Sequence, residues 1–269
     1  MPEDIWHLFY KNYCREAEMR LKDKSEVKEI RLNKFLSDAG VCSRREADRL
    51  TEAGEITIND CIAVLGDKVT DTDVVKVKGK EVSREEEQII IAFNKPEGVE
   101  CTAQKDNPDN IIDYIGYEKR IYPIGRLDKN SRGLILLTND GSIVNGILKA
   151  SNYHEKEYVV TVDKEITGEF IEAMSSGVTI LDGVKTRPCE VKKTKKHEFN
   201  IVLTQGLNRQ IRRMCKALGY NVTKLQRVRI MNIELGTLGM GKYRNLTDTE
   251  VEQLLDQIKD SNGDTDGQK

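Results

Sequence analysis

The sequence predicts a two-domain protein in which each domain combines helices with strands. A chain of 269 residues is long enough for about two domains. Helical spacing of apolar residues and short apolar runs typical of strands occur on both sides of residue 85. The two sides are separated by Ser83-Arg-Glu-Glu-Glu-Gln88, whose charge is typical of a linker. We therefore expect a small domain at residues 30–80, a linker at 81–88 and a larger domain at 89–258.

The composition excludes several classes of protein. Hydrophobic residues make up 38% of the chain and charged residues 33%, so a core can form beneath a strongly charged surface. No run approaches the roughly 18 apolar residues of a membrane span, so we expect a cytoplasmic protein without a membrane partner. The six cysteines include no Cys-x-x-Cys pair, so no metal site is expected.

The two ends of the chain differ from the rest. Residues 1–29 begin with a short helical stripe and then become almost wholly polar, which predicts a loosely attached helical extension. Met19 is an alternative natural start, and the sequence leaves both starts open. Residues 259–269 are rich in Gly, Asp, Ser, Asn and Gln, so a disordered tail is expected there.

The smaller domain is predicted to hold two helices followed by short strands. Apolar residues recur at helical spacing over residues 32–39, and Gly40 is a typical helix stop. Ser43-Arg-Arg-Glu46 is a capping box, which predicts the start of a second helix. Short strands are expected at residues 55–59 and 74–77.

The larger domain alternates between strand and helix patterns. Strands are predicted at 89–93, 134–137, 155–162, 199–203 and 219–233, and a strand followed by a turn at 177–183. Helices are predicted at 143–148, 170–174, 209–218 and from 247. In the helix at 209–218 a buried stripe is formed by Ile211, Met214, Cys215 and Leu218. At about 100° per residue, Arg209 and Arg213 would face away from that stripe and Arg212 would lie on its flank.

The stretch most suggestive of chemistry is Ile124-Gly-Arg-Leu-Asp-Lys-Asn-Ser-Arg-Gly-Leu-Ile-Leu-Leu-Thr-Asn-Asp140. It places Asp128 among three cations and then continues into an apolar strand. A loop anchored in this way can hold a charged reactive group rigidly. Spacing alone favours the other interpretation, a surface turn of mixed charge before a strand, because charged turns are common.

The charge is distributed unevenly along the chain. The net charge is only −2, which by itself argues against a nucleic-acid partner. Residues 187–244, however, contain 14 Lys and Arg against 3 Asp and Glu, a surplus of 11. Residues 30–80 are balanced, with 9 basic and 9 acidic side chains. The surplus at 187–244 is the kind of footprint that attracts phosphates.

Two motifs resemble known families. The stretch around Asp128 resembles the Arg-Leu-Asp motif of pseudouridine synthases, in the form found in the RsuA branch. The segments Arg-Leu-Asn-Lys-Phe-Leu-Ser and Cys-Ser-Arg-Arg-Glu-Ala-Asp resemble the S4 RNA-binding domain. The resemblance covers about residues 30–250. It implies an α+β fold, with a small S4 (alpha-L) domain followed by a catalytic domain built on a mixed, largely antiparallel sheet.

The resemblance also implies roles for individual residues. Asp128 matches the catalytic Asp, and Tyr158 matches the active-site Tyr of a Lys-x-Tyr motif. Arg212, within Gly-Leu-Asn-Arg-Gln-Ile-Arg-Arg-Met, matches the residue that pairs with that Asp. Lys95 belongs to a Lys-Pro-x-Gly motif that mostly supports the site. Cations near the motifs are expected to contact RNA: Arg31, Lys34, Arg44, Arg45, Lys95, Arg126, Lys129, Arg209, Arg213, Lys224, Arg227 and Arg229.

The expected function is site-specific isomerisation of uridine to pseudouridine in ribosomal RNA, without metal or organic cofactor. Lys224-Leu-Gln-Arg-Val-Arg-Ile-Met-Asn232 is most similar to the RluF branch of the RsuA/RluB/RluF family, which implies large-subunit (23S) RNA as the partner. A tRNA is a further candidate substrate, and a monomer is expected. Asp128 can act as nucleophile or as base. The alternatives are a non-catalytic S4-type ribosome-binding or assembly protein and an RNA hydrolase that uses Asp128.

Overall fold

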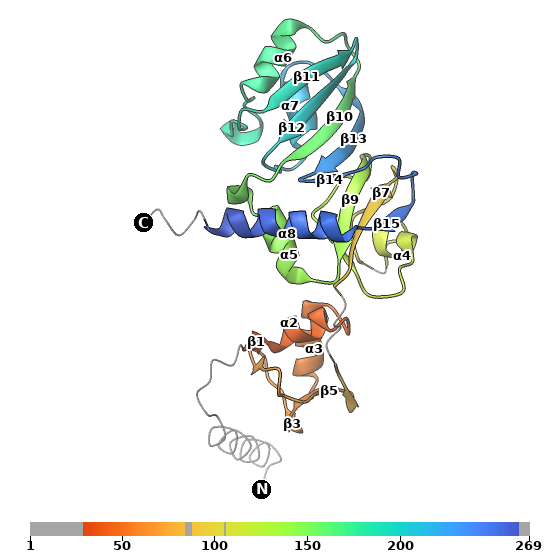
Figure 1. The fold of residues 1–269 in the computed structure, drawn as a ribbon, viewed down its shortest axis with the longest axis vertical. Helices are drawn as coiled ribbons and strands as arrows, with labels where there is room; N and C mark the ends of the chain where they lie inside the picture. Colours follow the sequence, from red (N-terminus) through yellow and green to blue (C-terminus); the bar gives the residue numbers. More distant parts are fainter. Residues whose placement is uncertain (1–28, 84–87, 105, 264–269) are drawn as a thin grey trace. The chain divides into compact units, whose positions relative to one another are not determined.

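The computed structural model describes residues 29–83, 88–104 and 106–263 (Figure 1). The alternative start at Met19 and almost all of the expected N-terminal extension lie outside these residues. The chain divides into two compact units, with the boundary between Glu87 and Gln88. Because the two units are separate bodies, each is described by itself.

The first unit packs two helices against short strands. The helices are α2 (Leu32–Asp38) and α3 (Arg44–Glu52). The strands are β1 (Ile30–Arg31), β2 (Ile56–Ile58), β3 (Cys61–Ile62), β4 (Lys68–Val69), β5 (Val75–Val77) and β6 (Lys80–Glu81). Strands β3-β2-β5-β6 form one antiparallel sheet, and β1 pairs with β4. Of the expected capping box, the N-cap bond is present, because Ser43 Oγ accepts a hydrogen bond from the Glu46 N–H at 3.2 Å.

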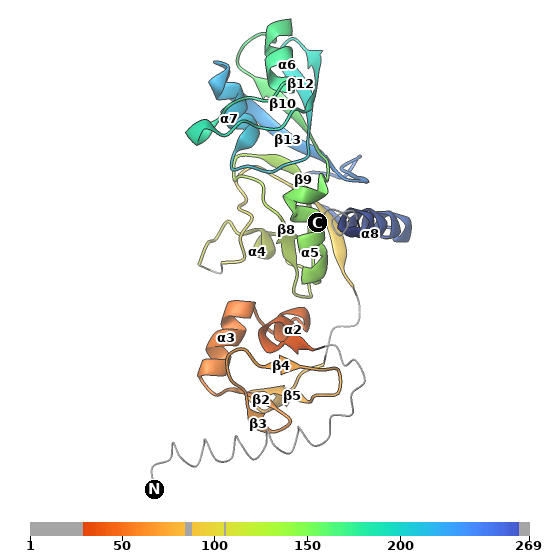
Figure 2. The ribbon, with the colours of Figure 1, turned by 90° about the vertical axis from the view of Figure 1, so that its left-hand side faces the viewer.

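The second unit is built on a nine-stranded sheet in the order β11-β12-β10-β13-β9-β7-β15, with β14 beside β13 and β8 beside β9 (Figures 1 and 2). The strands are β7 (Ile90–Lys95), β8 (Tyr122–Ile124), β9 (Arg132–Thr138), β10 (Lys156–Val162), β11 (Glu190–Lys195), β12 (Glu198–Leu203), β13 (Val222–Ile230), β14 (Ile233–Glu234) and β15 (Tyr243–Asn245). Strands β9 and β13 run parallel, whereas the other paired strands described in this sheet are antiparallel. The expected mixed, largely antiparallel sheet is confirmed.

Helices cover this sheet. They are α4 (Ile111–Ile115), α5 (Gly141–Leu148), α6 (Gly168–Ser175), α7 (Gln210–Ala217) and α8 (Asp248–Gly263), with short 3₁₀ turns η1 (Ala150–Asn152) and η2 (Leu181–Gly183). Helices α5 and α8 lie side by side in Figure 1 and share one core cluster. Helix α7 packs with α6 over the sheet edge formed by β10 to β12, where Ile211, Met214 and Cys215 are buried as expected. Among the described residues, no helix is both long enough and apolar enough to cross a membrane.

Two expectations differ in part from the structure. A strand and turn were predicted at residues 177–183; the turn is present as η2, but the strand is reduced to an isolated bridge between Thr179 and Lys185. Disorder was expected from Lys259, but α8 continues to Gly263, and residues 264–269 lie outside the described residues. Ile258 is buried in the core beneath α8, and Lys259 pairs with Asp256 at 3.2 Å. The packing of Ile258 therefore stabilises the end of the helix, in a segment whose composition alone suggested a disordered tail.

Strand β9 is the rigid base of the second unit. Leu134 and Leu136 are buried in the cluster beneath α5 and α8, whereas Ile135 and Leu137 are buried in the cluster beneath α4. A strand buried on both faces has little freedom to move.

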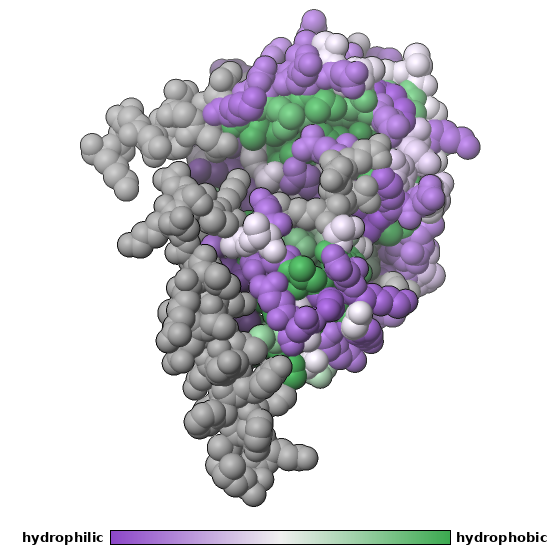
Figure 3. Space-filling view, turned by 60° about the horizontal axis from the view of Figure 1, so that its bottom comes forward, coloured by the Kyte–Doolittle hydropathy of each residue, from purple (hydrophilic) through white to green (hydrophobic). Residues whose placement is uncertain are grey.

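The face drawn in Figure 3 is largely hydrophilic, and its hydrophobic side chains gather in patches.

Gly133 is needed where β9 meets β13. Its φ is +103°, and a Cβ atom there would collide with the carbonyl oxygen of Arg227, its cross-strand partner. Only glycine combines this backbone conformation with so close an approach. The parallel contact between β9 and β13 therefore depends on Gly133, near the start of β9.

Candidate active site

Asp128 lies in the loop between β8 and β9, five residues before Gly133. Its carbonyl oxygen accepts a hydrogen bond from the Ser131 N–H at 2.9 Å, which closes a tight turn directly before β9. The preceding residue, Leu127, is buried, and its N–H donates to Cys101 Sγ at 3.3 Å. The loop is thus fixed on both sides of Asp128. The carboxylate itself is 31% exposed and borders a cavity.

Two arginines flank the carboxylate. Arg209 Nη1 lies 3.5 Å from Asp128 Oδ2, and Arg212 Nε lies 3.8 Å from the same oxygen. Arg212 is only 15% exposed. It donates to the carbonyl oxygens of Asn130 at 2.8 Å and Val222 at 3.2 Å, so it ties the Asp128 loop to β13. Burial, followed by the charge of Arg209, lowers the pKa of Arg212.

Arg209 faces away from the buried stripe of α7, as expected, but its contact with Asp128 was not predicted. Arg209 is the N-cap of α7, which begins at Gln210, and its φ is +51°. The rule of about 100° per residue holds only inside a helix, so it could not place this side chain. Arg209 is 47% exposed and can contact both Asp128 and a substrate. Arg213 does lie within α7, and its Nη2 donates to Asn208 Oδ1 at 2.6 Å.

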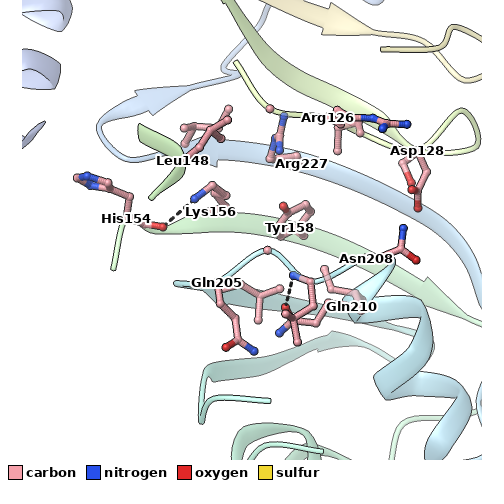
Figure 4. Close-up of a pocket in the computed structure, with 18 of the residues that line it drawn as sticks. Arg126, Asp128, Leu148, His154, Lys156, Tyr158, Gln205, Asn208, Gln210 and Arg227 are labelled. Carbon is pink, nitrogen blue, oxygen red and sulfur yellow. Dashed lines mark hydrogen bonds between the residues drawn. The ribbon is translucent and has the colours of Figure 1, made fainter. Parts of the chain in front are cut away.

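The cavity beside Asp128 has a volume of about 580 Å³ and is bounded by β10, β13 and the loops before β9 and α7 (Figure 4). Tyr158 lies on its floor, between Asp128 on one side and Lys156 on the other. The ring of Tyr158 packs against two core clusters, which fixes its position. Such an aromatic floor can stack on a nucleobase.

Other cations also border the cavity or lie beside it. Arg126 is exposed at its rim, and Arg227 is buried at its floor with only 4% exposure. Lys129 is about half exposed and pairs with Asp109 at 2.7 Å. Lys224 is exposed on β13. Arg126 and Lys224 are therefore placed to meet phosphates, whereas Asp109 already balances the charge of Lys129. Arg227 can be reached only from within the cavity.

Two residues expected to contact RNA are placed otherwise. Lys95 is completely buried, and its Nζ donates to the carbonyl oxygens of Pro96 at 2.9 Å and Val99 at 2.7 Å. Burial lowers the pKa of Lys95. It holds the loop after β7 and cannot reach RNA. Arg229 pairs with Glu155 at 3.0 Å and Glu157 at 3.1 Å, so its charge is neutralised within the protein.

The four cations expected to contact RNA in the first unit all reach its surface, but their pairing differs. Arg31 and Arg45 are exposed. Lys34 pairs with Asp38 at 2.6 Å, and Arg44 donates to Asn33 Oδ1 at 3.3 Å. The exposed Arg31 and Arg45 are therefore the better placed of the four for RNA phosphates.

The expectations named neither His154 nor Lys156 as a site residue, yet both line the cavity. Lys156 Nζ donates to the His154 carbonyl oxygen at 3.0 Å. Burial and the nearby charge of Arg227 lower the pKa of Lys156 to about 8. The signal was available in the sequence, because side chains two residues apart on a strand share a face, and Lys156 is two residues before Tyr158. In residues 29–83, 88–104 and 106–263, no group of three or more His, Cys, Asp or Glu side chains is arranged to hold a metal ion.

Comparison with known proteins places these features in a family. Residues 89–217 match the RNA pseudouridylate synthase family, and residues 30–75 match the S4 domain. The chain is 52% identical over 237 residues to the dual-specificity RNA pseudouridine synthase RluF of Escherichia coli K12, covering 87% of this chain and 81% of that protein. It is 37% identical to the ribosomal large subunit pseudouridine synthase B of Bacillus subtilis, covering 83% and 95%. A crystal structure of a pseudouridylate synthase aligns with a TM-score of 0.62 at 28% identity, covering 84% of this chain and 99% of the other.

Proposed function

Because the chain belongs to the RNA pseudouridine synthase family, we propose that it converts a uridine of large-subunit ribosomal RNA to pseudouridine at Asp128. As a member of this family it is an isomerase that acts on RNA. The names of two relatives support this choice of RNA. The B. subtilis relative is named a ribosomal large subunit enzyme, and the E. coli relative is named a dual-specificity enzyme. For a second substrate we propose a tRNA.

One observation carries the assignment of the site. Asp128, Tyr158 and Arg209 come from segments far apart in the chain and line one cavity, and Arg212 pairs with Asp128 beside it. A target uridine inside a helix must be flipped out to enter it, at a cost of a few kcal/mol. Tyr158 then stacks on the base, and Asp128 acts on the nucleoside as nucleophile or base. Arg212 holds the carboxylate and its loop in place.

The first unit would position the RNA. We propose that the S4 domain occupies residues 30–80 and the catalytic domain residues 89–258, limits supported by the division of the chain after Glu87. Exposed Arg31 and Arg45 would contact phosphates, which set register and carry little sequence information. We propose that the protein works as a monomer in the cytoplasm.

A turnover assay tests this function against its alternatives. Ribosomal RNA carrying tritium at C5 of uridine should release tritium to water, because C5 loses its hydrogen when it bonds to C1′. A non-catalytic ribosome-binding protein would bind the RNA and release none. An RNA hydrolase would shorten the RNA, so gel electrophoresis of the same samples should show an intact chain.

A further inference from the structure

Two cations on the cavity floor, the buried Arg227 and the partly buried Lys156, have no carboxylate partner among the described residues. Arg227 Nε donates to the Leu134 carbonyl oxygen at 2.7 Å, but its buried Nη2 has no hydrogen-bond partner in the described residues. Lys156 donates to the His154 carbonyl oxygen and forms no ion pair within residues 29–83, 88–104 and 106–263. Among the described residues that line the cavity, Asp128 is the one carboxylate.

The two cations stand on the same face as Tyr158. Arg227 of β13 is the cross-strand partner of Tyr158 in β10, and Lys156 precedes Tyr158 by two residues on the same strand. Side chains two residues apart on a strand are about 7 Å apart. In Figure 4, Lys156 lies on the side of Tyr158 away from Asp128. A base stacked on Tyr158 with its sugar toward Asp128 would therefore direct its far edge at these cations.

The charges at the rim and at the floor of the cavity face different parts of a nucleotide. Arg126, Lys149 and Arg209 are exposed at the rim, where the RNA backbone stays when a base is flipped out. Arg227 is buried at the floor, where only the base can reach. Burying unpaired cations costs free energy unless a partner supplies negative charge or acceptors. The floor therefore fits an acceptor on the base better than a phosphate.

We propose that Lys156 and Arg227 bind the carbonyl oxygens of the target uracil and stabilise the negative charge that develops on it during the reaction. This inference rests on the proposed function. When the C1′–N1 bond breaks, its electron pair leaves with the base, and the resulting uracil anion carries the charge on its ring nitrogens, O2 and O4. C5 then bonds to C1′, and the C5 proton moves to N1, so the product is an isomer of the substrate. Fixed donors aimed at such a developing charge are effective because they need no reorganisation.

The positive charge and the position of Lys156 fit this role. Its pKa of about 8 leaves the ammonium group mostly protonated at neutral pH. It is also held by the His154 carbonyl oxygen, so its position does not depend on the substrate. Because that contact uses one of three N–H donors, the others remain available to the base.

A leaving-group comparison tests the proposal. Single-turnover rates would be measured at saturating RNA on a ribosomal RNA segment containing the mapped target, transcribed with either uridine or 5-fluorouridine. The disappearance of the target nucleoside is measured by digesting the RNA and analysing the nucleosides by mass spectrometry. Lys156→Met should slow the reaction of uridine by at least about 30-fold, as expected for loss of a donor at a developing charge. The rate reduction that Lys156→Met causes with 5-fluorouridine should be several-fold smaller, because fluorine already stabilises the base anion.

The matched control is Lys185→Met, which removes an exposed lysine of the same unit outside the cavity and should leave both rates unchanged. Lys156→Arg, which keeps the charge, should recover most of the rate. If Lys156→Met does not fold, Lys156→Gln takes its place, because it keeps a donor for the His154 carbonyl.

Other outcomes would overturn the proposal. Equal losses on the two substrates would mean that Lys156 only supports the structure. Weaker binding and a smaller salt dependence, at an unchanged saturated rate, would mean that it contacts a phosphate. Absence of turnover by the unmodified protein would instead reject the proposed function itself.

Discussion

Arg209 and Asp128 are 81 positions apart in the chain, yet Arg209 Nη1 lies 3.5 Å from Asp128 Oδ2. The contact exists because Arg209 adopts a left-handed backbone conformation directly before α7. Its more exposed side chain covers the carboxylate from the solvent side, whereas the buried Arg212 holds the same loop from within. The two arginines therefore have different tasks, and substitutions should separate them.

Arg212→Ala should reduce the single-turnover rate by at least about a hundredfold, because it removes the group that fixes the Asp128 loop and balances its charge. Arg213→Ala, one residue further along, should mainly weaken RNA affinity and lower the salt slope by about 1. Rates at saturating RNA and affinities at several salt concentrations measure both effects. Similar behaviour of the two variants would show that Arg212 has no special role.

Gly133→Ala should destabilise the second unit by at least about 2 kcal/mol, since the new Cβ would meet the Arg227 carbonyl oxygen at a positive φ. The control is Gly168→Ala at the start of α6, where a Cβ would meet no atom within 4 Å. Denaturant melts of both variants provide the measurement. Equal stability of the two would mean that β9 and β13 approach less closely than described.

The rate of the chemical step should fall as the pH rises through about 8, because the lowered pKa of Lys156 is about 8 and only its protonated form carries charge. The charged and titratable groups that face it are Arg227 of β13 and His154 of the preceding turn. In Lys156→Arg the guanidinium stays protonated, so this decline should disappear. Single-turnover rates from about pH 6.5 to 9.5 test this. An unchanged decline in Lys156→Arg would assign it to another group.

Removal of residues 1–80 should weaken binding to structured RNA more than it slows chemistry on bound substrate. The first unit has its own core, and its cations belong to a different unit from Asp128. Binding assays and single-turnover rates at saturating RNA separate the two effects. A collapse of the saturated rate with affinity intact would mean that this unit helps to form the active site.

Local patterns in the sequence predicted much of the fold. The N-cap at Ser43 and the buried stripe of α7 follow from spacing alone, and both are present. The prediction of disorder from Lys259, which was based on composition, failed because Ile258 packs into a core that the sequence of the tail does not reveal. Lys95 and Arg229 were misplaced for a related reason. Whether a cation faces RNA, a carbonyl group or a carboxylate depends on partners distant in the chain.

The site was predicted unevenly. The motif around Asp128 was recognisable because its residues are contiguous. Arg209 could not be placed, since its position depends on a backbone conformation just outside the helix. Arg227 lies 93 positions from its partner Leu134, and only the pairing of β9 with β13 places its buried charge at the cavity. Long-range strand pairing thus determined the part of the site that local spacing did not reveal.

The most direct test of the central claim is to map pseudouridine in 23S ribosomal RNA from cells with and without this gene, and from deleted cells that express Asp128→Asn. The deletion should remove pseudouridine from a specific position. The unmodified gene should restore it, and Asp128→Asn should not, while its RNA affinity stays within a few-fold of the unmodified protein. An unchanged modification pattern after deletion, or full restoration by Asp128→Asn, would contradict the account.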